Sequence, residues 1–346
     1  MKPLNILYVH SHDTGRYIQP YGYAIPTPNL QRLAGQGVLF RQAFCAGPTC
    51  SPSRASLLTG TWPHVNGMIG LAHRGSRLRD YNWHLAGYLR RHGYATALSG
   101  VHHEVDNAER HLLGYEHFLD APAEAGQDGN NAFARRAADF VERRPPEPFF
   151  LSCGFGLTHR TGTGVQWHNG PASPLGDPRH VRPPAPLPDL PAIRRDFADF
   201  IEAACRLDRC MGMVLEALDR SGQADRTLVI ATTDHGIAFP FMKCNLTDHG
   251  IGVMLILRGG GFGGGKVVDA MVSQIDVFPT VCELAGLPVP PWVSGSSLSP
   301  LATGEALSLH DEVFAEVTYH AAPEPMRAVR TSRHKYIRRF EGRSRY

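Results

Sequence analysis

Short apolar runs alternate along the chain with segments whose apolar residues recur every three or four positions. Runs of four to eight apolar residues bounded by turn signals are typical of buried strands. We expect strands over Asn5–Val9, Val38–Ala43, Tyr94–Leu98, Phe149–Cys153, Leu228–Thr232 and Val253–Leu257. We expect helices over Pro28–Ala34, Ser51–Leu58, Trp83–His92, Asn131–Arg143, Asp196–Leu218 and Gln274–Ala285. This alternation predicts an α/β fold with a mostly parallel sheet flanked by helices.

Two segments depart from this alternation. Residues 160–193 are rich in Gly, Pro and His without periodicity, which predicts a long loop that is functional or mobile. Near the end of the chain, Glu312–Val317 and Arg327–Phe340 predict antiparallel strands. Two or three strands are marginally stable alone, so this fragment either packs on the main domain or begins a longer segment.

The composition narrows the class of protein. The chain has 346 residues, 42% hydrophobic and 19% charged, as expected for one large or two ordinary globular domains. Its net charge of +3 comes from scattered basic residues, which argues against nucleic acid as a partner. No apolar run reaches the length of a membrane span, and the start of the chain lacks signal-peptide features. As written, we expect a cytoplasmic protein, or a periplasmic or lysosomal-like one whose leader was removed.

The seven Cys residues include no CxxC spacing, so neither a disulfide framework nor a structural zinc site is expected. The 18 His residues are more informative. Four of the expected strands are followed by polar residues of ligand type, namely His10 to Asp13, His102 to Glu104, His159 with Arg160, and Asp234 with His235. The carboxyl ends of parallel strands line the crevice where α/β proteins bind ligands. One such His is usually a surface or core residue, whereas four clusters predict a common site.

The segment Cys50-Ser51-Pro52-Ser53-Arg54 precedes an expected helix. Pro52 fits the first helical turn, so Cys50 lies where free N–H groups and the helix dipole favour an anion. Arg54 then offers a planar donor fork to a tetrahedral oxyanion. From the Cys alone, an ordinary buried residue remains the simpler interpretation. A thiolate phosphatase is excluded, because its Arg would occupy the position of Ser56.

This segment and the following Ala55-Ser56-Leu57-Leu58-Thr59-Gly60 resemble the sulfatase signature, in which the Cys is oxidised to Cα-formylglycine. Further matching pieces are Asn5-Ile6-Leu7, Thr27-Pro28-Asn29-Leu30, Thr233-Asp234-His235-Gly236 and Ser273 to Thr280. His64 to Met68, Pro148 to Leu151, Asp234 to Pro240 and Pro325 to Val329 are most similar to the heparan N-sulfatases (N-sulfoglucosamine sulfohydrolases). The resemblance implies an alkaline-phosphatase-like sandwich. It implies a catalytic domain over residues 1–310 and the beginning of an antiparallel C-terminal subdomain over 311–346, which we expect to be truncated.

The resemblance also implies a divalent metal held by Asp13, Asp234, His235 and the oxidised Cys50. His12 stands where the family usually has Asp, so it is either a further ligand or a substrate contact. Family likeness favours Ca²⁺, whereas imidazole ligands suit Mn²⁺, the second candidate.

By the same resemblance, Arg54 holds the formylglycine hydrate and His103 is the base that regenerates the aldehyde. His159 protonates the leaving group, and Lys243, one of only four Lys residues, holds a sulfate oxygen. Val101 occupies the place of a family Lys, and His102 is the candidate replacement in substrate binding.

The implied activity is hydrolysis of a sulfamate or sulfate ester of a carbohydrate, with N-sulfoglucosamine favoured, as in glycosaminoglycan degradation. The implied partners are that sugar, bound by loops near 73–79 and 160–185 and by the C-terminal subdomain, and a formylglycine-generating enzyme that acts on Cys50. A phosphonate monoester or phosphodiester hydrolase of the same superfamily and a non-catalytic sugar-binding relative remain alternatives. No oligomeric state is predicted.

Overall fold

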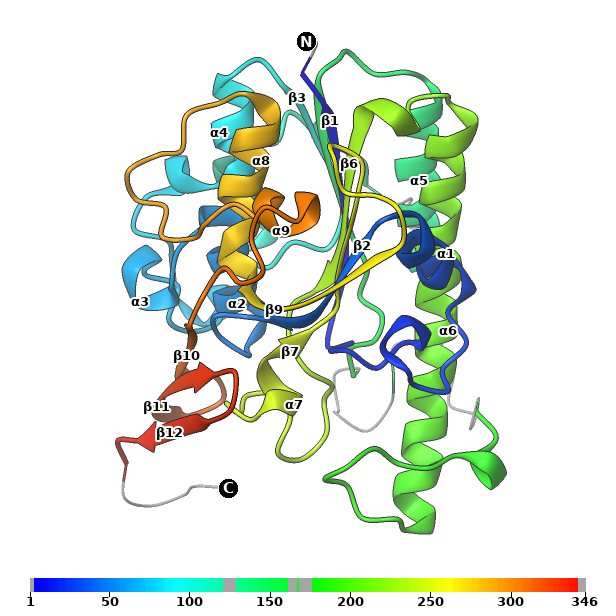
Figure 1. The fold of residues 1–346 in the computed structure, drawn as a ribbon, viewed down its shortest axis with the longest axis vertical. Helices are drawn as coiled ribbons and strands as arrows, with labels where there is room; N and C mark the ends of the chain where they lie inside the picture. The colour runs from blue at the N-terminus through cyan, green and yellow to red at the C-terminus, as the bar shows by residue number, and fades with distance from the viewer. Residues whose placement is uncertain (1–2, 121–128, 161–166, 168–175, 342–346) are drawn as a thin grey trace.

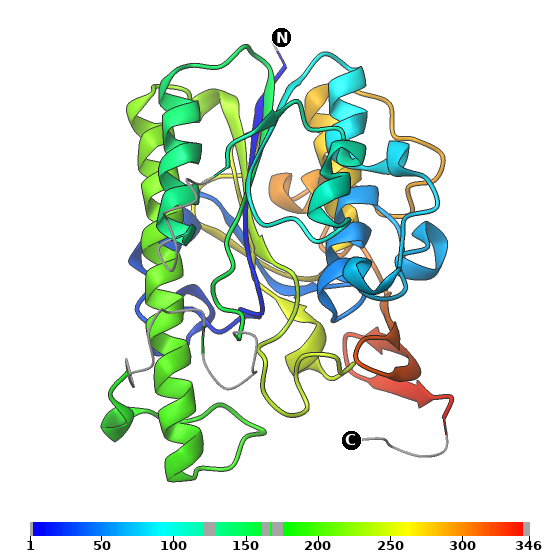
Figure 2. The same ribbon diagram turned by 180° about the vertical axis from the view of Figure 1, so that it is seen from behind.

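A large central sheet lies between two layers of helices (Figures 1 and 2). The computed structural model describes residues 3–120, 129–160, 167 and 176–341, and in this part the sheet has nine strands. The strands are β1 Asn5–Ser11, β2 Val38–Phe44, β3 Ala95–Gly100, β4 His117–Phe118, β5 Phe149–Gly154, β6 Thr227–Thr233, β7 Gly252–Val253, β8 Leu255–Arg258 and β9 Lys266–Ser273. Their order is β4-β3-β5-β1-β6-β8-β2-β7, and β9 pairs with β2. The predicted α/β class is confirmed.

Four neighbouring strands form the parallel centre of the sheet. β1 pairs in parallel with β5 and β6, and β5 pairs in parallel with β3. β8 runs antiparallel to both β6 and β2 and so separates the parallel centre from β2 and β9. All seven residues of β1 are buried, which explains why it has no alternation of polar and apolar positions.

The core is divided by the sheet. Alternate residues of β1 point to opposite faces, so Ile6 and Tyr8 join one apolar cluster while Leu7 and Val9 join the other. One layer contains α1 Pro28–Gln36, α5 Gly129–Glu142 and α6 Pro191–Arg220. The other contains α2 Cys50–Thr59, α3 Pro63–Asn66, α4 Leu85–Arg91, α8 Val277–Ala285 and α9 Ser299–Thr303. No helix of the described residues is long and apolar enough to cross a bilayer.

The boundaries differ from the sequence expectation in several places. The long helix α6 begins at Pro191 rather than Asp196, because Pro suits the first turn of a helix, and it ends the predicted loop early. The region expected as one strand over Val253–Leu257 is two strands, β7 and β8; both pair with β2, and β8 also pairs with β6. The strand β9 was not predicted, because only its last three residues are buried and the other five are exposed or partly exposed. Residues 161–166 and 168–175 of the predicted loop lie outside the described part.

The chain ends in a separate antiparallel sheet that packs beside the short helix α7 Asp248–Ile251 (Figure 1). Its strands are β10 Glu312–Tyr319, β11 Pro323–Thr331 and β12 Lys335–Arg339, in that order. The range Arg327–Phe340, expected as a single strand, contains the turn between β11 and β12. Asp248 holds this sheet to the main body through ion pairs with Arg330 at 3.3 Å and Lys335 at 2.5 Å.

Candidate active site

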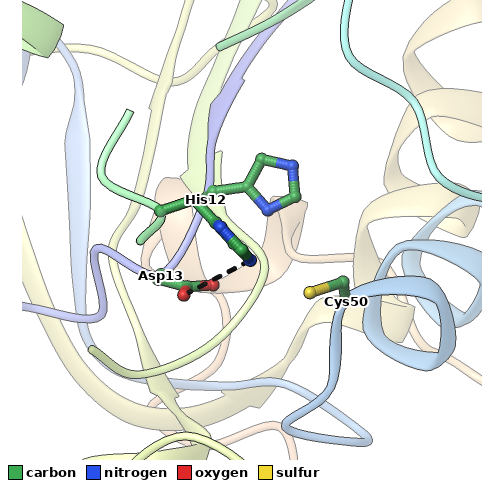
Figure 3. A group of neighbouring side chains, drawn as sticks. His12, Asp13 and Cys50 are labelled. Carbon is green, nitrogen blue, oxygen red and sulfur yellow. Dashed lines mark ion pairs between the residues drawn. The ribbon is translucent and has the colours of Figure 1, made fainter. Parts of the chain in front are cut away.

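The polar residues that follow the four parallel strands meet at one edge of the sheet, as the sequence predicts. β3, β5, β1 and β6 are consecutive neighbours, so their carboxyl ends lie side by side. Two overlapping groups of ligand-type side chains result, each with ligand atoms within 4.8 Å of one another. They are Asp13, Cys50, Asp234 and His235, and His12, Asp13, Cys50 and His159. In Figure 3 the Cys50 sulfur points from its helix toward the loop of His12 and Asp13.

Asp13 is a fully buried carboxylate with two kinds of neighbour. Its Oδ2 accepts a hydrogen bond from Lys243 Nζ at 2.7 Å. Its Oδ1 is 3.4 Å from His235 Nε2 and has no hydrogen-bond partner among the described residues. The backbone at Asp13 has a φ of 50°, a left-handed conformation uncommon outside Gly, and its N–H donates to Asp234 Oδ1 at 2.8 Å. The loop is thus held in a strained shape that turns an unpaired oxygen toward the group.

Asp234 is surrounded by cationic and imidazole groups. Its Oδ2 lies 3.1 Å from both Arg54 and His12. Burial opposes ionisation of the carboxyl, but His235, Arg54 and His12 outweigh it and hold the pKa of Asp234 well below its usual value. The residue is therefore an anion at neutral pH, as a metal ligand must be.

The orientation of His235 is set by its own loop. Its Nδ1 is 3.0 Å from the carbonyl oxygen of Gly236, so Nδ1 carries the proton and donates it there. The Nε2 atom consequently faces Cys50 Sγ at 3.6 Å and Asp13 Oδ1 at 3.4 Å. Burial opposes the charged form, yet Asp234 and Asp13 raise the pKa of His235.

Cys50 is the first residue of helix α2 and is buried, as predicted for the motif. Ser53 and Gln274 connect the start of α2 to the end of β6. Neither residue was assigned to the site from the sequence. Ser53 Oγ donates to the carbonyl oxygen of Asp234 at 2.5 Å, and Gln274 Nε2 donates to that of Thr233 at 2.6 Å. The sequence signals for Gln274 were its place at the start of an expected helix and in the segment Ser273 to Thr280 that resembles the sulfatases.

Arg54 is a fully buried cation that spans two strands. Besides Asp234, it donates to the Ser11 carbonyl oxygen at 2.8 Å and lies 2.5 Å from His10 Nδ1. His10 was part of the polar run after the first strand, but the sequence assigned it no role. Burial, followed by Arg54, lowers the pKa of His10 well below its usual value, so His10 stays neutral and accepts from Arg54.

Three imidazoles cluster beside the carboxylates. The His12 ring centroid is 4.6 Å from that of His103 and 5.2 Å from that of His159. His159 Nδ1 donates to the Arg160 carbonyl oxygen, which leaves its Nε2 to accept from Lys243 Nζ at 3.1 Å. Burial, followed by Arg54, lowers the pKa of His103 to about 3, so His103 is a neutral imidazole able to take a proton.

The predicted substrate contact His102 turns to different partners. Its Nε2 is 2.9 Å from Asn107 Oδ1, and its Nδ1 is 3.9 Å from Glu104. His102 and His103 line a cavity of about 310 Å³ that also includes Val101, where the family Lys is missing. Glu104, at the end of the same polar run, is buried and was given no role by the sequence.

Two family models together match residues 4–346. Residues 4–287 match the sulfatase family, and residues 241–346 match the C-terminal domain described as "N-sulphoglucosamine sulphohydrolase, C-terminal". The chain belongs to the sulfatase family. It is thus a hydrolase of sulfate esters, and its resemblance to the N-sulfoglucosamine sulfohydrolases is confirmed at the level of the matching C-terminal domain.

Two relatives of this sulfatase illustrate the range of the likeness. Human N-sulphoglucosamine sulphohydrolase is 31% identical over 372 residues, which cover 97% of this chain and 73% of the relative. An ulvan-active sulfatase from Formosa agariphila is 25% identical over 97% of this chain and 61% of its own length. The sulfatase described here therefore spans under two thirds of the second relative.

Solved structures share the fold of this sulfatase. A 2-O GAG sulfatase has a TM-score of 0.79 and 23% identity, over 99% of this chain and 84% of that one. A phosphonate monoester hydrolase from Silicibacter pomeroyi has a TM-score of 0.77 and 21% identity, over 97% and 87% of the two chains. Because both activities occur on this fold, the fold alone does not separate sulfate from phosphonate ester chemistry.

The residues of this sulfatase fit the divalent metal that its family typically uses. Two buried carboxylates, Asp13 and Asp234, lie in this group, and Asp13 Oδ1 has no hydrogen-bond partner among the described residues. His235 directs a lone pair at Nε2 toward the same space, and its second nitrogen is anchored, as is usual for a metal-ligating His. Two carboxylates and one imidazole are a donor set for a hard or borderline cation.

Proposed function

We propose that this sulfatase hydrolyses the sulfamate or sulfate ester of a glycosaminoglycan-type sugar, with N-sulfoglucosamine favoured, after Cys50 is oxidised to formylglycine. The observation on which this rests is the position of Cys50, buried at the start of α2 with its Sγ in one group with Asp13, Asp234 and His235. An oxidised side chain there would hydrate and offer a hydroxyl group in place of the thiol.

Asp13, Asp234, His235 and residue 50 would hold the divalent cation. When bound, the cation supplies positive charge that offsets the two carboxylates and attracts the sulfate group. Family likeness supports Ca²⁺ as the first candidate. The imidazole of His235, and that of His12 close to Asp234, support Mn²⁺ as the second.

Arg54 and His103 act on the residue 50 side of the bound sulfate. Arg54 is fully ionised and fully buried, so it holds the negative charge that develops near Asp234 without needing to move. His103 is neutral and half-buried beside His12, so it takes the proton of the second hydroxyl group of residue 50 when the sulfated hydrate releases sulfate and returns to the aldehyde.

His159 and Lys243 act on the leaving group. Lys243 Nζ holds its proton between Asp13 Oδ2 and His159 Nε2. Lys243 can transfer one of its protons to His159 Nε2, which passes it to the departing nitrogen or oxygen, while the remaining N–H groups of Lys243 hold a sulfate oxygen. Burial opposes the charged form, but Asp13 raises the pKa of Lys243, so the proton is present at neutral pH.

The sugar is proposed from relatives. Human N-sulphoglucosamine sulphohydrolase is 31% identical, and the last hundred residues match the C-terminal domain that bears the same name. A Δ4,5-hexuronate-2-O-sulfatase from Bacteroides thetaiotaomicron is 26% identical over 95% of the chain. Both names support a sulfated glycosaminoglycan fragment, and the first supports the N-sulfated glucosamine.

Two measurements on the full chain test this proposal. The tryptic peptide 42–54, isolated from a host that contains a formylglycine-generating enzyme, is expected to be about 18 Da lighter than its unmodified Cys form. Turnover is then compared for N-sulfoglucosamine, an O-sulfated glucosamine and a phosphodiester. We expect Cys50→Ala to abolish turnover and Cys205→Ala, a partly exposed Cys on α6, to preserve it.

Two outcomes would overturn the proposal. A phosphodiester preference of several orders of magnitude would identify a phosphonate monoester or phosphodiester hydrolase instead. An unmodified Cys50 together with sugar binding would identify the non-catalytic relative.

A further inference from the structure

A second cavity opens beside the candidate active site and shares Lys243 with it. It measures about 400 Å³ and lies between the loop after β6 and the C-terminal sheet. Its wall includes Lys243, whose Nζ also contacts Asp13 and His159. The cavity therefore shares a wall with the group that the proposed function places on the leaving-group side.

One wall of this cavity is an exposed aromatic ring. Phe241 is 68% exposed, one of the most exposed large apolar side chains among the described residues. Its φ of 65° is a left-handed conformation that costs free energy for a residue with a side chain. An exposed ring held in this way at a cavity wall offers a flat apolar face to a ligand.

The opposite wall is polar and comes from the C-terminal sheet. Arg339 on β12 donates to Oε1 of Glu324 on β11 at 2.6 Å. Oε2 of Glu324 has no hydrogen-bond partner among the described residues, although the side chain is only 19% exposed. A carboxylate held on one oxygen and open on the other is an acceptor for hydroxyl or amino groups.

His320, in the turn that links β10 and β11, completes this wall. Burial, followed by the charge of Lys243, lowers the pKa of His320 to about 4. His320 is therefore a neutral donor and acceptor at physiological pH, which adds polarity to the cavity without adding charge.

We propose that Phe241 and the Glu324–Arg339 pair form the subsite that binds the sugar ring of the substrate. Phe241 receives the apolar face of the ring, and Glu324 accepts hydrogen bonds from its hydroxyl or amino groups. This inference rests on the proposed function, since it assigns the sugar to the cavity beside the leaving-group residues. It also makes the C-terminal sheet part of the substrate site. Glu324 of this sheet lies 81 residues after Lys243 in the sequence.

Binding to the full chain carrying Cys50→Ala tests the subsite without turnover. The probes, measured by calorimetry, are N-sulfoglucosamine, glucosamine and inorganic sulfate. We expect Phe241→Ala to weaken binding of both sugars about 3- to 10-fold and Glu324→Gln about 10- to 100-fold. Sulfate binding should stay within 2-fold, because the proposed function places the sulfate group at Lys243 and the proposed metal ligands rather than at Phe241 and Glu324.

Tyr336→Ala is the matched control. Tyr336 is 64% exposed on β12 and is not part of the cavity wall, so its loss should leave all three affinities unchanged. Thermal melting of each variant separates a local effect from unfolding of the C-terminal sheet.

The subsite is overturned if the two variants leave sugar binding unchanged, or if sugar and sulfate binding fall together. Failure of the proposed function gives a different result. In that case the wild-type chain binds the sugars, with dependence on Phe241 and Glu324, but releases no sulfate from them.

Discussion

Lys243 and Asp13 form an ion pair with Nζ 2.7 Å from Oδ2, and this contact joins the loop after β6 to the loop after β1. The Asp13 side chain is fully buried and that of Lys243 is 13% exposed. A buried carboxylate needs a compensating charge, and Lys243 supplies it from a position 230 residues along the chain. Lys243 also lines the cavity of Phe241 and Glu324, which is proposed to bind the sugar. It therefore connects the proposed metal ligand Asp13 with this cavity.

Replacing Lys243 with Ala leaves Asp13 buried without this partner. We expect the folded state to lose about 3–5 kcal/mol when no divalent cation is present. Added Mn²⁺ or Ca²⁺ should recover part of this loss, because a cation supplies the missing positive charge to Asp13. Urea unfolding with and without the cation measures both effects. Lys266→Ala, a change at an exposed lysine of β9, is the control, and equal stability of K243A and wild type would contradict the role of the pair.

The relative affinity of the site for Ca²⁺ and Mn²⁺ should depend on whether residue 235 provides a nitrogen or an oxygen ligand. Replacing His235 with Asn exchanges an imidazole nitrogen for an amide oxygen. Since Ca²⁺ prefers oxygen and Mn²⁺ accepts imidazole, we expect H235N to bind Ca²⁺ relatively more tightly, by about 10-fold in the affinity ratio. Calorimetric titration of chelator-treated protein gives the two affinities. His249→Asn, on α7, is the control, and an unchanged ratio in H235N would remove His235 from the metal site.

The proposed base His103 can be separated from its neighbour in sequence. We expect His103→Ala to lower kcat about 10²- to 10⁴-fold, because it removes a positioned proton acceptor. KM should change little, since His103 lies beside His12 and does not line the cavity of Phe241 and Glu324. His102 contacts Asn107, so we expect His102→Ala to have a much smaller effect on kcat. Steady-state kinetics on both variants decide, and the reverse order would assign the base to His102.

Glu104 should make stability depend on pH. Burial raises the pKa of Glu104 to about 7, whereas an unfolded chain has a Glu pKa of about 4.3. Between these values the unfolded state loses its proton first, so stability falls as pH rises from about 4.3 to 7 and stays lower above. Glu104→Gln imitates the protonated form. We expect it to match wild type near pH 4.5 and to be more stable by a few kcal/mol at pH 8.

Thermal melting at the two pH values tests this expectation. Glu305→Gln, a change at an exposed residue, should have no effect at either pH. If E104Q is less stable than wild type at pH 8, Glu104 instead serves as a needed counter-charge for the nearby Arg54.

Much of the active site was predictable from the sequence because its residues follow strand ends. One or two of these residues follow the end of each apolar run, namely His12 with Asp13, His103, His159, and Asp234 with His235. Parallel strands place such residues at one edge of the sheet. Cys50 and Arg54 were predictable from a motif whose helix starts at Cys50 in the structure. The roles assigned to these residues by resemblance remain predictions, as do the boundary near residue 310 and the formation of formylglycine.

By itself, the sequence determined the α/β class, the residues available at the strand ends and the family, since all three depend on local pattern. Only the tertiary structure decided which distant groups share a charge or a cavity. Strand order and helix packing bring together Ser53 and Asp234, Arg54 and His10, and Lys243 and Asp13. The local periodicity of the sequence contains no information on either. The cavity lined by Phe241 and Glu324 likewise depends on the C-terminal sheet packing against the main body, through apolar residues such as Val317 and Met326 and through the ion pairs of Asp248.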